Sequence, residues 1–140
     1  MYFLYEDSDV LNRPVECFYF DTTSRYFPVR AHWHFYLELV LMLSGSVVMS
    51  SGSEKFTLHE GEMVLFHPKA VHSMTGTAGG SARYAVVKLD INRMNLTTSY
   101  SPKLRSIFRS AEKKGMCTTF DAACAEAMGA REIFARCIDE

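Results

Sequence analysis

The chain lacks an apolar run long enough to cross a membrane. Its longest apolar segment, from Trp33 to Leu43, is interrupted by Glu38 and is too short to span a bilayer. The N-terminal residues contain no basic region followed by a long apolar stretch, so the sequence predicts no signal peptide. We therefore expect a soluble cytoplasmic protein that makes no contact with a membrane.

The chain also lacks a block of lysines or arginines. Its 140 residues contain 15 Lys and Arg against 16 Asp and Glu, for a formal net charge of −1. DNA binding depends on cationic side chains that neutralise phosphates. This balance argues against direct DNA binding by this part of the chain.

The cysteines lack the Cys-x-x-Cys spacing of metal-binding and redox motifs. Cys17 stands alone, whereas Cys117, Cys124 and Cys137 lie in a tail with helical character. We expect free, buried thiols in a reducing compartment rather than disulfides.

Apolar residues make up 48% of the chain and aromatic residues 13%, which favours a packed globular domain. We expect one domain over residues 1–140, with a barrel over about 1–90 and a helical segment over about 91–140. Turn signals recur about every eight to twelve residues, a spacing typical of an antiparallel barrel or sandwich. The expected strands cover residues 15–20, 29–43, 47–50, 55–58, 63–67, 71–75 and 82–89.

The hydrophobic period changes to that of a helix after Asp90. Ser101-Pro102 is a good helix start and Gly115 a plausible stop, so the first helix is expected between them. A second helix is expected from near Thr119 to Gly129, and a third from near Ala130 onward. The second is expected to present Phe120, Ala123, Cys124 and Ala127, and the third Ile133, Phe134, Cys137 and Ile138. No stop signal precedes Glu140, so we expect the natural chain to continue.

The candidate site begins on the long strand expected from Val29 to Leu43. Side chains of equal parity share one face of a strand, so His32, His34 and Glu38 would point the same way. An antiparallel sheet could bring His72 back to the same place. Histidine nitrogens and a carboxylate form a ligand set for a divalent ion, which we expect to be zinc, nickel, iron or manganese. The alternative is a metal-free polar pocket in which these groups hydrogen-bond a ligand or one another.

Other side chains near this face carry weaker signals. Tyr36 shares the inward face and would contact a ligand or serve as a core aromatic. Arg30 has the same parity and would clamp a carboxylate or a sugar hydroxyl, or else lie in solvent. We expect His67 at the rim of the barrel and His59 in an exposed turn. The odd-numbered face of the long strand is apolar and should pack beneath helices or another subunit.

Two stretches resemble known signatures. The pattern His32-x-His34-x₃-Glu38-x₆-Gly45 resembles the first motif of the cupin superfamily, and Gly61 followed by His72 resembles the second. Residues 30–45 and 56–66 are similar to the N-terminal sensor domain of AraC-type transcription regulators. The resemblance implies a cupin-type antiparallel β-barrel (a double-stranded β-helix, or jelly roll) followed by C-terminal α-helices.

The AraC-type resemblance also implies a function. In that family the barrel binds a small-molecule effector, the helices form a homodimer interface, and a separate C-terminal helix-turn-helix domain binds DNA. The effector would be a small polar molecule, sugar-like or a carboxylate, and the chain would not be an enzyme. Two alternatives remain at this point. One is a stand-alone metal-dependent cupin enzyme, a dioxygenase or isomerase with the His/His/Glu/His ligands, and the other is a carbohydrate-binding module.

Overall fold

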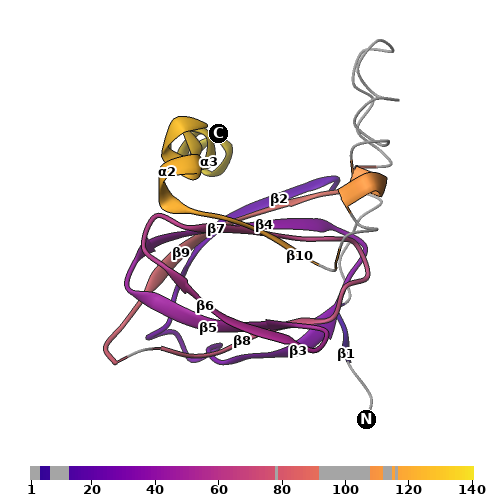
Figure 1. The fold of residues 1–140 in the computed structure, drawn as a ribbon, viewed down its shortest axis with the longest axis horizontal. Coiled ribbons are helices and arrows are strands. Elements are labelled where there is room, and N and C mark those ends of the chain that lie inside the picture. Colours follow the sequence, from indigo (N-terminus) through magenta and orange to yellow (C-terminus); the bar gives the residue numbers. More distant parts are fainter. Residues whose placement is uncertain (1–3, 7–12, 78, 92–107, 112–114, 116) are drawn as a thin grey trace.

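Two five-stranded sheets face each other and form a barrel (Figure 1). The computed structural model describes residues 4–6, 13–77, 79–91, 108–111, 115 and 117–140. The first sheet contains, in spatial order, β1 (Leu4–Tyr5), β3 (Val29–Trp33), β8 (His72–Thr77), β5 (Ser46–Ser51) and β6 (Glu54–His59). The second contains β10 (Cys117–Phe120), β7 (Met63–Phe66), β4 (Leu37–Ser44), β9 (Arg83–Leu89) and β2 (Val15–Asp21). All described pairings are antiparallel except that of β1 with β3. The predicted mainly-β barrel is confirmed.

The single long strand expected over residues 29–43 is wrong. The chain turns a corner at residues 34–36, so that β3 belongs to one sheet and β4 to the other. Groups outside the ladders hold this corner: Lys69 N donates to His34 O (2.8 Å), and the Tyr36 hydroxyl donates to the carbonyl of Arg13. The alternation of polar and apolar residues continues through residues 34–36, so the sequence pattern does not reveal the corner.

The central strands β7, β4 and β9 of the second sheet are buried on both faces. Even-numbered side chains of β4 and β9 point into the barrel, where Val40, Met42, Tyr84 and Val86 belong to its core. Odd-numbered ones point outward, and Leu41 packs there with residues of the two helices α2 (Ala122–Ala127) and α3 (Ala130–Asp139). In Figure 1 these helices lie against the outside of this sheet. The expected helical cover of the apolar odd face is therefore confirmed for β4.

The C-terminal segment differs from its prediction in detail. Thr119 and Phe120, expected to begin a helix, instead belong to β10, which extends the sheet beside β7. The helix begins later because the Asp121 side chain caps it, accepting a hydrogen bond from Cys124 N (2.7 Å). The buried residue of α2 is Ala125, so the expected seam of Ala123, Cys124 and Ala127 is wrong.

The helix expected from Ala130 onward is present as α3, and the helix expected between Ser101 and Gly115 is described only in part. In α3, Phe134 is buried and Ile138 half-buried, whereas Ile133 and Cys137 are exposed. The helix expected between Ser101 and Gly115 falls mostly outside the described residues, although residues 108–111 are helical. Among the described helices, none has the length and apolar character needed to cross a bilayer.

All four thiols are free, but they are not all buried. Cys17 and Cys117 are half-buried, and Cys124 and Cys137 are exposed. The prediction of free cysteines is confirmed and that of uniform burial is wrong, because Cys124 and Cys137 lie at exposed positions of α2 and α3.

Phe134 anchors α3 on the sheet, and its removal should show how much the helix contributes to stability. The side chain is 4% exposed and packs in the outer cluster with Leu41 and Ala130. We expect Phe134→Ala to lower the free energy of unfolding by about 3–5 kcal/mol, through lost burial and the cavity left behind. The matched control is Phe35→Ala at a 42% exposed site, where we expect a loss of about 1 kcal/mol or less. Denaturant unfolding followed by circular dichroism measures both, and equal losses would contradict the packing described here.

Candidate functional site

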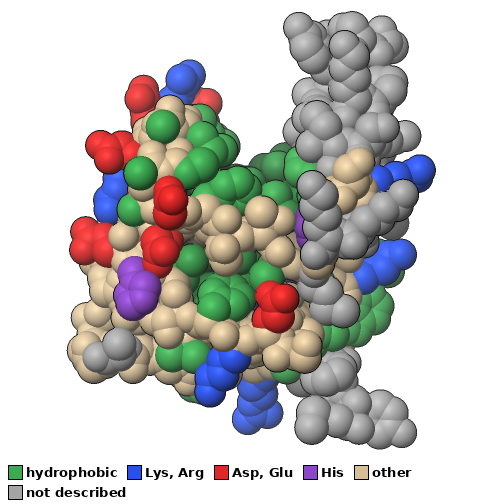
Figure 2. Space-filling model, in the orientation of Figure 1, with side chains coloured by type: hydrophobic (Ala, Val, Ile, Leu, Met, Phe, Trp, Pro, Cys, Tyr) green, Lys and Arg blue, Asp and Glu red, His purple; other side chains and the backbone are tan. Residues whose placement is uncertain are grey.

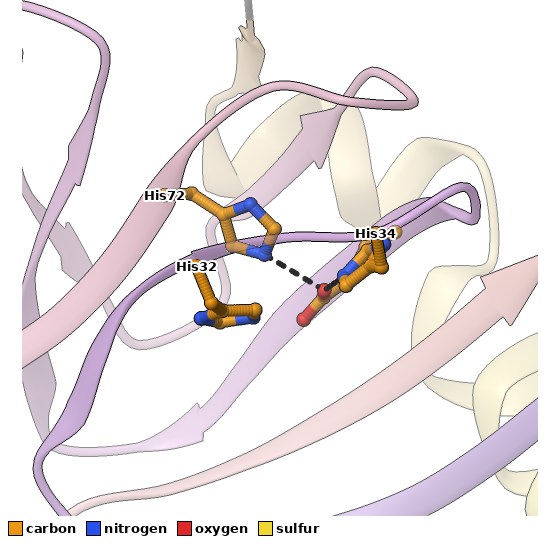
Figure 3. A group of neighbouring side chains, drawn as sticks. His32, His34 and His72 are labelled. Atoms are coloured by element: carbon orange, nitrogen blue, oxygen red, sulfur yellow. Dashed lines mark hydrogen bonds and ion pairs between the residues drawn. The ribbon is translucent and has the colours of Figure 1, made fainter. Parts of the chain in front are cut away.

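Four potential metal ligands converge inside the barrel, although not on one strand. His32 on β3 and His72 on β8 are cross-strand partners, whereas Glu38 lies on β4 of the opposite sheet. His34 comes from the corner between β3 and β4. One ligand atom from each of the four residues lies within 4.8 Å of the others. Figure 3 shows His34 and His72 hydrogen-bonded to one carboxylate, that of Glu38, with His32 beside them. The barrel corner, rather than strand parity, brings this set together.

Each of the three histidines is oriented by a backbone carbonyl two residues away. The Nδ1···O distances are 2.7 Å for His32 to Arg30, 3.1 Å for His34 to Tyr36 and 2.9 Å for His72 to Ala70. A carbonyl oxygen can only accept, so each Nδ1 carries the proton. The Nε2 atoms are then the ones that can act as ligands, an arrangement typical of metal-binding histidines.

The contacts of Glu38 test whether these residues fit a metal ion. Its Oε2 lies 2.7 Å from His34 Nε2 and 2.9 Å from His72 Nε2. With Nδ1 protonated, a neutral imidazole presents a lone pair to this oxygen, so the contact requires an imidazolium or a shared cation. Ligand atoms about 2.1 Å from an ion and at right angles to each other lie about 3 Å apart. The donor types and the spacing of these three residues therefore fit a divalent ion.

Glu38 is an ionised group in the barrel interior. It is 3% exposed, and burial by itself raises the pKa of its carboxyl. The charge of His72 and the hydrogen bonds from His34 and His72 outweigh that effect and hold the pKa of Glu38 well below its usual range. A buried carboxylate of this kind must have a positive partner, because an isolated charge is too costly to bury.

A cavity of about 420 Å³ lies beside this cluster. Its walls are largely apolar and include Phe18, Phe20, Val29, Met74, Tyr84 and Val86. Its charged end is formed by Glu6, His32, Glu38 and Lys88. A concave, mostly apolar cavity with a few converging polar groups is the usual form of a small-molecule site.

The other candidate residues are distributed differently. Arg30 is exposed and lies at the wall of the cavity. Tyr36 is fully buried, donates its hydroxyl to the carbonyl of Arg13 and does not line the cavity. His67, expected at the rim, is 2% exposed, so that expectation is wrong: it directly follows β7, whose side chains are all buried. His59 is exposed, as expected.

Lys88 is the cavity residue that sequence reasoning missed. It is 4% exposed and stands directly opposite Glu38 in the register of β9 with β4. Burial lowers the pKa of a lysine, but Glu38 and Glu6 outweigh it and raise the pKa of Lys88. A signal was available, because Lys88 interrupts an apolar strand at the parity of Tyr84 and Val86.

Glu6 is the second residue missed. Its Oε1 lies 3.0 Å from Lys88 Nζ, and its Oε2 lies 3.2 Å from His32 Nε2. The hydrogen bond from His32, together with the charge of Lys88, outweighs burial and lowers the pKa of Glu6 to about 2. No sequence pattern marks this residue, since its role depends on β1 pairing with β3.

Comparisons with known proteins extend these observations. A search of curated proteins found no significant match. Among solved structures, an apo ToxT variant from Vibrio cholerae is 11% identical, with a TM-score of 0.55. The match covers 89% of this chain and 48% of that one, and it shows a shared fold. A cupin-family protein with a double-stranded β-helix fold from Methanocaldococcus jannaschii is 13% identical, with a TM-score of 0.49, and the match covers 65% of this chain and 75% of that one.

The family assignment comes from the sequence match. The family model described as AraC-like ligand binding domain matches residues 13–136, which include β2 to β10 and most of α3. The matched range thus contains His32, His34, Glu38 and His72 and most of the cavity wall. This chain belongs to the AraC-like ligand-binding domain family.

Proposed function

We propose that this chain is the effector-sensing domain of an AraC-type transcription regulator. The observation that carries the proposal is the apolar cavity with its buried charged end, in a member of a ligand-binding family. Residues 1–140 would form a single sensor domain, with the barrel over about 1–90 and the helical segment over about 91–140. Contact with DNA would belong to a separate helix-turn-helix domain.

The proposed effector is a small polar molecule, sugar-like or a carboxylate, bound at the charged end of the cavity. His32 and Glu38 would contact it directly, and Arg30 is placed to reach it from the cavity wall. Binding would alter the position of the helices or of the N-terminal segment relative to the barrel. Typical allosteric couplings of this kind amount to about 1–3 kcal/mol.

We also propose that His32, His34, Glu38 and His72 hold one divalent ion, with zinc, nickel, iron and manganese as candidates. Support comes from the fixed Nδ1 protons and from the short Glu38 contacts described above. A bound ion would supply a Lewis-acidic position for a ligand oxygen. The histidines would orient it, and the apolar walls would exclude water from it.

A metal-dependent cupin enzyme, a dioxygenase or an isomerase, is the second candidate. The same cluster favours it, since four protein ligands can leave coordination positions open for a substrate. Oxygen uptake and product analysis on a substrate panel, with iron- or manganese-loaded protein, separate the two: turnover supports the enzyme.

A homodimer is the proposed assembly. Support comes from the outer side of the helices, where Met128 is 51% exposed and Ile133 54% exposed. Figure 2 shows hydrophobic side chains among charged ones of both signs over the corner formed by α2 and α3. Apolar groups surrounded by charges are typical of protein interfaces.

Filling the cavity should abolish effector binding. Val86 lines the cavity wall at 1% exposure, and a phenylalanine there would occupy the space of the ligand. We expect an effector at 100 times its Kd to stabilise the wild-type chain by about 2.7 kcal/mol and Val86→Phe by close to zero. Thermal-shift screening measures this. Val15→Phe, the same change at a 46% exposed site, should respond like the wild type. An equal response from Val86→Phe would place the ligand outside the barrel.

Metal binding should depend on the buried histidines and not on histidine in general. We expect the wild-type chain to bind one equivalent of zinc or nickel, and His72→Ala to weaken that affinity at least about 100-fold. Calorimetric titration after chelator treatment and dialysis measures both. The control is His59→Ala, which removes an exposed histidine and should leave the affinity unchanged. Failure of the folded wild-type chain to bind either ion stoichiometrically would contradict the metal proposal.

Self-association should depend on the outer face of α3. We expect Ile133→Ser to weaken dimerisation about tenfold or more, because it removes a large apolar group from the proposed interface. Sedimentation velocity over a concentration series measures this change. Glu132→Ser, at the neighbouring exposed position of the same helix, should have a smaller effect. A monomer at every concentration tested would rule the dimer out for this chain.

A further inference from the structure

We propose that the cavity binds a small carboxylic acid, as its anion, with an apolar or aromatic body. In the absence of this ligand, the side-chain carboxylate of Glu6 occupies the position where the ligand's carboxylate binds. The inference rests on the proposed ligand-binding function and names its ligand class. It also assigns Lys88 and, in the metal-free chain, His32 as the anion-binding pair, and Glu6 as the group that the ligand displaces.

Glu6 is bound as a carboxylate ligand would be. One of its oxygens lies 3.0 Å from Lys88 Nζ and the other 3.2 Å from His32 Nε2. The carboxylate thus bridges two nitrogen groups from opposite sheets, β9 and β3. Neither contact requires the carboxylate to belong to the chain, so a free carboxylate can make the same two bonds.

Lys88 is the reason to expect an anion rather than a neutral sugar. Its side chain is 5% exposed, and a buried ammonium group needs a negative partner. Glu38 lies opposite it, but Oε2 of Glu38 is already hydrogen-bonded to both His34 and His72. Of the described residues, Glu6 is the carboxylate that contacts Lys88 Nζ directly. Glu38 therefore offsets the charge of Lys88 without contacting it, and a ligand that displaces Glu6 restores the direct contact best with a negative group of its own.

The remainder of the cavity indicates an apolar body for the ligand. Phe18, Phe20, Val29, Met74 and Val86 form the part of the wall that offers no side-chain hydrogen-bond donor or acceptor except the weak thioether of Met74; hydroxyls enter the lining only with the tyrosines Tyr5, Tyr26 and Tyr84. Phe20 and Tyr84 stack with ring centroids 5.2 Å apart. A sugar would leave most of its hydroxyls facing these walls unpaired, at a cost in free energy. A ring or a short alkyl chain would pack against them.

Glu6 is held in a way that permits its displacement. It follows β1, a strand of two residues, and its own N–H donates to the carbonyl of Trp33 at 2.9 Å. Tyr5 covers Trp33 with ring centroids 4.8 Å apart, yet Tyr5 is 42% exposed. The Glu6 side chain is itself 39% exposed, in contrast to Lys88. Trp33, the only tryptophan in the sequence, would report a movement of this segment.

The test uses four carboxylates and their uncharged amides: benzoate, phenylacetate, 3-phenylpropionate and hexanoate. We expect at least one carboxylate to bind the full chain more tightly than its amide in calorimetric titration. Its binding should also change the fluorescence of Trp33 because Tyr5 leaves the indole. Glu6→Gln and Glu6→Ala should strengthen carboxylate binding about tenfold or more, since a charged competitor has been removed. Lys88→Met should abolish the preference for the carboxylate, and Lys88→Arg should retain it.

The controls separate competition from a general effect on the fold. Asp139→Asn removes an exposed carboxylate at the end of α3 and should leave affinity for the same carboxylate unchanged. If Glu6 were only a structural residue, its variants would weaken binding or leave it unchanged, and that result overturns the proposal. Equal affinity for acid and amide overturns it too, as does failure of all four acids to bind the Glu6 variants. A neutral sugar that binds and is blocked by Val86→Phe would overturn this inference while leaving the effector-sensing function intact.

Discussion

A buried carboxylate sets the main constraint on this barrel. Glu38 lies inside the second sheet at 3% exposure, where an unpaired charge would cost several kcal/mol. The fold supplies its partners from three directions: the corner gives His34, β8 gives His72, and β9 gives Lys88 in the opposing register position. The closure of the barrel and the chemistry of its interior are therefore linked, because each partner reaches Glu38 only when its own element is paired correctly.

The second sheet makes this interior site possible because its central strands are buried on both faces. Odd-numbered residues of β4 and β9 pack under α2 and α3, and even-numbered residues enclose the cavity. Aromatic and aliphatic walls lower the polarity around Lys88, His32 and Glu38, which strengthens the interactions among their charges. The packing that stabilises the fold therefore also strengthens the interaction of the charged end of the cavity with a charged ligand.

The N-terminal segment connects the interior to the surface. Glu6 reaches Lys88 and His32, while the adjacent Tyr5 packs on Trp33 and Phe35 at the outside. Because Glu6 and Tyr5 are adjacent in the chain, a displacement of Glu6 from the charged end of the cavity would also move Tyr5 within this exposed aromatic cluster. The helices and this segment approach the barrel from different sides in Figure 1.

The sequence alone was enough to predict the β-barrel, the apolar face beneath the helices and the four residues His32, His34, Glu38 and His72. Alternating polarity is a local property that marks strands in the sequence, whereas the four ligands meet through the corner and not on one strand face. Only the tertiary structure revealed the corner at residues 34–36, the additional strand β10 and the entry of Glu6 and Lys88 into the cavity. These features depend on contacts between residues far apart in the chain, such as Glu6 with Lys88, and local patterns carry no information about which distant groups will meet.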